Sequence, residues 1–234
     1  MKSFSSFVGA LLSVALLAAC SGNSASTPVA VVPSSRADSL TANRSSASVA
    51  PETRHNAVTF KSLFSFNPGD GANPIASLTY VGGLLYGTTE SGGLRSGAGG
   101  GTVFTITPSG TQKVLHIFGN AGDGAVPTAA LKYVKGALYG TTSQGGASGV
   151  GTVFRITASG NEKILHSFGG TGDGASPWAT LTDVEGALYG TTVAGGAHYS
   201  GTVYTIATSG VERVLYNFKG LRSDGERPLA SPTA

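Results

Sequence analysis

The sequence predicts an all-β protein built from a tandem repeat, on three observations. Similar segments recur about every 50 residues, and a fixed period of this length is typical of repeat architectures. Each period holds four short apolar runs of strand length, without helical periodicity. The 36 glycines lie mainly at turn positions between those runs and lack the three-residue period of collagen.

Composition narrows the function classes. The hydrophobic fraction of 40% suffices for one sizeable domain. The net charge is only +3 and no cluster of lysines and arginines is present, so we predict no nucleic-acid partner. The single cysteine excludes intramolecular disulfides and zinc sites made of several cysteines.

The first element is a signal sequence. A positive start at Lys2 precedes an apolar run over residues 7–19, which is too short to cross a bilayer and fits an export signal. It ends in Leu17-Ala18-Ala19-Cys20, which resembles the lipobox of bacterial lipoproteins. We therefore predict a lipoprotein signal peptide over residues 1–19 and a lipid anchor on Cys20. The alternative is an ordinary signal peptide with a coincidental cysteine.

The anchor predicts location and a membrane partner. Ser21 follows the cysteine, and a residue other than aspartate there resembles the sorting pattern of outer-membrane lipoproteins. We expect an exported chain, held in the bacterial envelope at the outer membrane. Residues 20–57 are rich in Ser, Ala, Thr and Pro and are predicted to be a flexible tether.

The repeat domain is predicted over residues 58–228. Its strongest signals are a Phe that closes each repeat, the motif Leu-Tyr-Gly-Thr-Thr and the motif Gly-Thr-Val-(Phe/Tyr). The Phe recurs at Phe66, Phe118, Phe168 and Phe218, the first motif begins at Leu85, Leu138 and Leu188, and the second begins at Gly101, Gly151 and Gly201.

Each repeat divides into four predicted strands, which in the second complete copy are Ala130–Val134, Ala137–Thr142, Thr152–Thr157 and Lys163–Phe168. Tight hairpin turns such as Lys135-Gly136 join them. Four antiparallel strands in about 50 residues match one blade of a β-propeller. The glycine inside Leu-Tyr-Gly-Thr-Thr marks either a close approach of another backbone near a propeller axis or a β-bulge.

We therefore predict a β-propeller-like array of four-stranded antiparallel blades. About three blades are complete, an extra N-terminal strand lies at Phe60–Phe66, and residues 229–234 form a truncated repeat tail in which Pro232 disfavours a strand. Propellers usually have 4–8 blades, so unpaired strand edges are expected. This predicts an open arc, a truncated gene product, or closure by self-association.

The motif set resembles a known family. Leu-Tyr-Gly-Thr-Thr, Gly-Gly, Gly-Thr-Val-Phe, Ser-Gly and Phe-x-Gly-Asp-Gly-Ala-x-Pro together resemble the GloVer (Gloeo–Verruco) tandem-repeat family of exported, envelope-anchored bacterial proteins. The resemblance covers roughly residues 58–228. It implies a propeller-like fold and supplies no catalytic residues.

Two sets of repeated side chains are candidate metal ligands. An Asp-Gly pair recurs at Asp70, Asp123, Asp173 and Asp224. Calcium needs six to eight oxygens, so a turn in which Asp bonds the backbone and Gly takes a positive φ is favoured. His116 and His166 share a repeat position with Phe64 and Tyr216, which favours ring packing over metal binding.

Three other patterns have both a functional and a structural interpretation. The Gly-Gly loops at Gly92, Gly145 and Gly195 lack the pattern of a phosphate loop. Asp183 and Glu185 lie close together beside a turn, and a carboxylate pair there stays open. Tyr86, Tyr139 and Tyr189 with Trp178 could form a sugar-binding surface, but core packing is favoured for the tyrosines.

We predict no catalytic, cofactor-binding or metal-binding residue from these patterns. The leading hypothesis is a cell-envelope binding or scaffold module that uses propeller loops to hold a protein or a glycan. One alternative is a propeller enzyme, a lyase or hydrolase of glycans or lactones. Another is a nonfunctional, truncated remnant of a longer propeller. Propellers serve many functions, so the fold does not decide between these.

Overall fold

The computed structural model describes residues 60–94 and 99–233. The predicted signal peptide, Cys20 and the tether lie outside the described residues. Within the described part, all regular elements are β-strands, which confirms the all-β prediction. The described part contains no helix with the length and apolar character of a membrane span.

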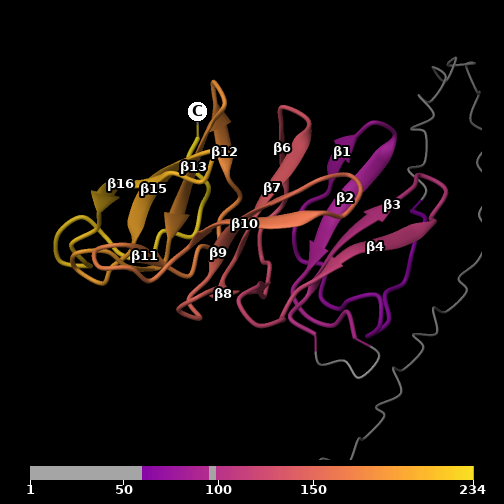
Figure 1. Ribbon diagram of the computed structural model, residues 1–234, viewed down its shortest axis with the longest axis horizontal. Coiled ribbons are helices and arrows are strands. Elements are labelled where there is room, and N and C mark those ends of the chain that lie inside the picture. Colours follow the sequence, from indigo (N-terminus) through magenta and orange to yellow (C-terminus); the bar gives the residue numbers. More distant parts are fainter. Residues whose placement is uncertain (1–59, 95–98, 234) are drawn as a thin grey trace, which may run out of the picture. The chain divides into compact units, whose positions relative to one another are not determined.

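Three four-stranded antiparallel sheets follow one another along the chain (Figure 1). In each, neighbouring strands follow in sequence order, apart from short ladders in the loops. The first sheet contains β1 (Thr79–Val81), β2 (Leu84–Thr89), β3 (Thr102–Ile106) and β4 (Gln112–Ile117). The second contains β6 (Lys132–Val134), β7 (Ala137–Thr142), β9 (Thr152–Ile156) and β10 (Glu162–Ser167). The third contains β12 (Thr182–Val184), β13 (Ala187–Thr192), β15 (Thr202–Ala207) and β16 (Glu212–Asn217).

The core lies between consecutive sheets. Tyr86 and Val103 of the first sheet cluster with Leu138 and Phe154 of the second and with Leu131, which lies directly before β6. The second sheet contributes Tyr139 and Val153 to the next cluster, where they meet the third sheet's Leu188, Tyr204 and Ile206. Each sheet therefore buries its apolar faces against its neighbours, as expected for a repeat that cannot form a core alone.

Hydroxyl groups connect the sheets at equivalent positions. The first Thr of each Leu-Tyr-Gly-Thr-Thr motif donates a hydrogen bond to a carbonyl of the following repeat. Thr88 donates to Ala129 O at 3.1 Å, and Thr141 donates to Ala179 O at 3.4 Å. Thr191 reaches the carbonyls of Pro228 and Ala230, so the tail covers the third sheet where a further repeat would begin.

The glycine inside the Leu-Tyr-Gly-Thr-Thr motif has a different cause from the two predicted. Gly87, Gly140 and Gly190 pair across the ladder with an aromatic residue of the next strand. A Cβ at Gly140 would lie 2.5 Å from Cζ of Phe154. An aromatic ring of the same sheet therefore covers the glycine, and the β-bulges lie in the neighbouring strand pair instead.

Two further predictions need correction. Residues 60–66 form no strand in the described structure, because the described residues supply no partner strand beside them. They pack through side chains instead, with the rings of Phe66 and Phe104 4.9 Å apart. The Gly-rich loops also pair, since β5 (Gly124–Ala125) joins β8 (Gln144–Gly145) and β11 (Gly174–Ala175) joins β14 (Ala194–Gly195).

Candidate functional site

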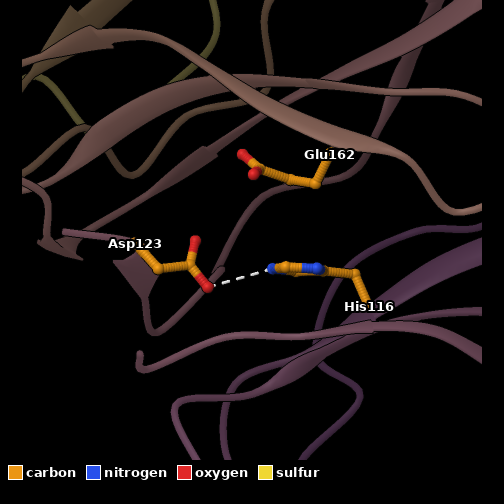
Figure 2. A group of neighbouring side chains, drawn as sticks. All are labelled: His116, Asp123 and Glu162. Atoms are coloured by element: carbon orange, nitrogen blue, oxygen red, sulfur yellow. Dashed lines mark hydrogen bonds and ion pairs between the residues drawn. The ribbon is translucent and has the colours of Figure 1, made fainter. Parts of the chain in front are cut away.

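A His–Asp–Glu cluster lies between the first and second sheets. Figure 2 shows its three side chains converging from separate segments. His116 lies near the end of β4, Asp123 lies in the loop to the second sheet, and Glu162 begins β10. The His116 Nε2 and the Asp123 Oδ2 are 3.0 Å apart. One ligand-type atom from each residue lies within 4.8 Å of those of the other two.

Local structure explains how each member is placed. The ladder between β3 and β4 shifts by one residue, so that His116 lies opposite Val103 while Val114 lies opposite Phe104. Such a bulge changes the direction of the side chains that follow it. Asp123 Oδ1 accepts a hydrogen bond from the Gly124 N–H at 2.7 Å. The other carboxylate oxygen of Asp123 is thereby directed toward the histidine.

The same cluster recurs between the second and third sheets. His166, Asp173 and Glu212 occupy the corresponding positions, 50 residues further along the chain. His166 Nε2 lies 2.9 Å from Asp173 Oδ2, and the Gly174 N–H donates to Asp173 Oδ1 at 2.7 Å. Two independent segments of sequence therefore build the same arrangement.

Burial makes both glutamates weaker acids than an exposed glutamate. Burial, and then repulsion by Asp123, raise the pKa of Glu162 to about 7, although His116 opposes the shift. Burial and Asp173 likewise raise the pKa of Glu212. Burial lowers the pKa of His166, but its hydrogen bond to Asp173 and the charges of Asp173 and Glu212 outweigh burial and raise that pKa overall.

One carboxylate oxygen of each glutamate is also unpaired within the part of the chain that the structure describes. Among the described residues, no hydrogen-bond partner reaches the buried Oε1 of Glu162 or of Glu212. An unpaired buried carboxylate is unfavourable unless a cation or a proton neutralises it. The arrangement of an imidazole nitrogen and two carboxylates can therefore hold a proton or a metal cation.

The first and last copies of the aspartate loop lack the His–Asp–Glu cluster. The first copy has Phe64 where His116 and His166 stand, and Gln112 where the glutamates stand, and its Asp70 accepts a hydrogen bond from Asn67. In the last copy the Tyr216 hydroxyl donates to Asp224. Histidine and glutamate thus occur together in the two complete sheet interfaces and are both replaced in the first copy.

The structure tests the interpretations of the aspartates and histidines. The backbone hydrogen bond is confirmed for Asp123, Asp173 and Asp224. The positive φ at the following glycine is confirmed for Gly71 and Gly225 but is wrong for Gly124 and Gly174. Gly124 and Gly174 are required by space, because a Cβ at Gly124 would lie 2.5 Å from the Thr142 hydroxyl. Ring packing is also observed, with His116 edge-on to Phe118 at 4.6 Å.

The other residues considered as functional candidates have structural roles in turns or in the core. The Gly-Gly loops contact the aspartate loops, and Gly146 N–H donates to Asp123 O at 2.6 Å. Asp183 accepts a hydrogen bond from Gly186 N–H at 2.9 Å within its turn, which gives this carboxylate a structural role. Tyr86 and Tyr139 are buried between sheets, as predicted, whereas Tyr189 is half-buried on the third sheet.

Sequence reasoning missed Glu162 and Glu212. Each lies 46 residues after the histidine that it approaches, and neither stands beside another acid in sequence. A signal was present in the repeat alignment. The position reads Gln112, Glu162 and Glu212, and the acid appears only where the preceding repeat carries histidine.

A second candidate is an open groove at the third sheet, with a volume of about 460 Å³. Trp178 and Tyr199 lie in its lining, 47% and 87% exposed, and Glu226 and Arg227 add charged groups. Tyr199 has a φ of 58°, which is rare for a bulky residue. The corresponding residue of the preceding repeat is Gly149.

Comparisons with known proteins identify the family. The model of the Gloeobacter/Verrucomicrobia repeat matches residues 47–234. The chain belongs to this repeat family. The match confirms the resemblance found in the repeat motifs, and none of the curated proteins matches the chain.

Three solved structures show a distant likeness to this family member. The computationally designed Ika4 protein is 14% identical with a TM-score of 0.43, and the match covers 74% of this chain and 86% of Ika4. The designed Ika8 protein (14%, TM-score 0.40) and the tricorn protease (15%, TM-score 0.38) match over 67% and 59% of this chain. The chain spans 38% of that Ika8 chain and 12% of the tricorn protease chain.

Proposed function

We propose that this repeat-family protein is an exported lipoprotein, anchored through Cys20, whose repeat domain binds an envelope glycan in the groove beside Trp178 and Tyr199. The anchor rests on residues 1–20, where an apolar export signal ends in the only cysteine. We further propose that the sheets are successive blades of a β-propeller-like array, a view supported by their face-to-face packing.

The conformation of Tyr199 carries the binding proposal. A non-glycine residue in the left-handed region costs about 1–2 kcal/mol, and residues in such conformations cluster at ligand sites. Burial does not compensate here, because the side chain is 87% exposed. The corresponding Gly149 adopts a φ of 74° without a side chain. Tyr199 therefore fits a residue kept for contact with a ligand.

The lining favours a glycan. Flat aromatic faces stack on the apolar faces of sugar rings. Carboxylates accept hydrogen bonds from the sugar hydroxyls, and guanidinium groups donate hydrogen bonds to them. Trp178 and Tyr199 supply the rings, and Glu226 and Arg227 supply the polar groups. Ligand sites in general combine aromatic lining with a few polar groups in this way.

The chain offers a direct assay, because Trp178 is its only tryptophan. Soluble peptidoglycan fragments and neutral oligosaccharides should be titrated into the full chain in detergent while tryptophan fluorescence is recorded. We expect saturable changes for at least one glycan. Binding measured by calorimetry should weaken at least about tenfold in Trp178→Ala, through loss of stacking of roughly 1.4 kcal/mol.

Tyr199→Gly is the sharper variant. It restores the residue that the preceding repeat carries, so the fold should be retained or gain stability while glycan affinity falls. Tyr80→Ala is the matched control, since Tyr80 is 66% exposed in the first sheet. Unchanged binding in Tyr199→Gly and Trp178→Ala would contradict the proposal. Capture of an envelope protein, with no glycan response, would favour a protein-binding module instead.

A further inference from the structure

We infer that the two His–Asp–Glu clusters are divalent transition-metal sites, each of which clips two neighbouring sheets together. The first site consists of His116, Asp123 and Glu162, and the second consists of His166, Asp173 and Glu212. This inference is independent of the glycan groove, because it uses none of the groove's residues.

The ligand set defines the class of metal. An imidazole nitrogen with two carboxylates suits zinc and related first-row divalent ions. Calcium prefers six to eight oxygen ligands, and each cluster offers only two carboxylates and a nitrogen. Three protein ligands leave one tetrahedral position for water.

The geometry is close to what such an ion needs. Tetrahedral zinc with bonds of about 2.0–2.1 Å holds its ligand atoms about 3.3 Å apart. His116 Nε2 and Asp123 Oδ2 are 3.0 Å apart, and the equivalent atoms of the second site are 2.9 Å apart. The third ligand atom lies within 4.8 Å of both. Binding of an ion would therefore draw the glutamate carboxylate closer to the other two ligand atoms.

The joint occurrence of histidine and glutamate is the second observation that indicates a ligand, because the acid stands only where the histidine faces it. Among the described residues, one buried side-chain atom lacks a partner at this position in all three repeats, namely Nε2 of Gln112, Oε1 of Glu162 and Oε1 of Glu212, but only the glutamates can carry a charge there. The chain itself shows that the fold does not require an acid there, because the first copy of the position, before the first sheet interface, carries Gln112 with Phe64. Two of three copies retain the combination that is unfavourable without a cation and favourable with one.

The position of the ligands gives the sites a structural role. Each site joins the outer strand of one sheet, the loop that leaves it and the outer strand of the next sheet. A bound ion would hold these three segments together, since an ion bound only by the folded state stabilises that state.

Zinc binding to the full chain, purified without a histidine tag and stripped with chelator, tests the inference. Calorimetry should give two equivalents of Zn²⁺ per chain, one for each cluster, and Zn²⁺ should raise the unfolding temperature. Asp123→Asn and Asp173→Asn should each remove one equivalent and together should remove both. Asp70→Asn is the matched control and should leave two equivalents, because the copy around Asp70 has Phe64 and Gln112 in place of the histidine and the glutamate.

Substitutions that copy Phe64 and Gln112 separate a loss of metal binding from simple misfolding. Glu162→Gln and His116→Phe install residues that this position already accepts in another copy, and each should weaken zinc binding at the first site more than roughly 100-fold. The inference is overturned if the chain binds no Zn²⁺ at micromolar concentration. It is equally overturned if the stoichiometry stays at two in the aspartate double variant, or if Ca²⁺ binds these sites more tightly than Zn²⁺.

Discussion

Replacing equivalent leucines in two repeats measures how much stability the sheet interfaces contribute. Leu131 is 2% exposed and packs in the cluster between the first and second sheets. Leu78 holds the same repeat position in the first sheet but is 48% exposed, because the described residues contain no sheet in front of it. Leu131→Ala and Leu78→Ala therefore remove the same atoms from two different environments.

The expected free-energy changes differ severalfold. Removing a fully buried leucine side chain costs about 2–5 kcal/mol, because the lost transfer energy and the remaining cavity add. At Leu78 about half of the side chain already contacts water and no closed cavity remains, so the cost should be about 1 kcal/mol. We expect Leu131→Ala to lower the free energy of unfolding by at least about 2 kcal/mol more than Leu78→Ala.

Urea denaturation of the full chain, followed by circular dichroism, measures both values. Equal losses for the two variants at low protein concentration would refute the proposed stacking of sheets. Protein concentration adds a second measurement. If copies associate through the open face beside Leu78, the cost of Leu78→Ala should grow as the concentration rises.

Three other predictions concern the repeats, and a fourth concerns the anchor. Gly160→Ala should lower the free energy of unfolding, measured by urea denaturation, by at least about 1 kcal/mol more than Gly136→Ala. Both glycines have a positive φ, but a Cβ at Gly160 would lie 2.7 Å from Leu115 O, whereas a Cβ at Gly136 would meet empty space. Tyr204→Phe should stabilise the chain by about 1 kcal/mol, since the buried hydroxyl lacks a partner among the described residues and both other repeats carry Phe. Glu162→Gln should raise metal-free stability at pH 8 by about 1 kcal/mol after solvent screening, measured by thermal unfolding with chelator. Cys20→Ser should abolish labelling by radioactive palmitate and release the chain from the membrane fraction.

The sequence predicted the regular strands well because their signals are local. Lys135 and Gly136 both adopt positive φ, as the predicted hairpin turn requires, and the four strands around them lie within two residues of their predicted bounds. The short ladders between Gly-rich loops were missed. Gly124 pairs with Gly145 through backbone groups, which leave no alternating side-chain pattern to read.

The sequence-based predictions were wrong where the role of a residue depends on a partner far away in the sequence. Residues 60–66 have the sequence of a strand, but a strand needs neighbours and the described residues supply none. Gly140 is set by the ring of Phe154 in the adjacent strand, and a single strand does not show which side chain will cover it. Glu162 meets His116 only after two sheets have packed.

The two proposed sites share one physical property, which is that their residues oppose local stability. Tyr199 takes a left-handed conformation that Gly149 adopts with less strain, and the half-buried Glu162 stands where Gln112 would avoid the charge. Both easier solutions occur elsewhere in this chain, so the fold accepts them. Departures from local preference are expected where function requires them. Stability and binding should therefore change in opposite directions in Tyr199→Gly and in Glu162→Gln, whereas a defect of packing alone would lower both together.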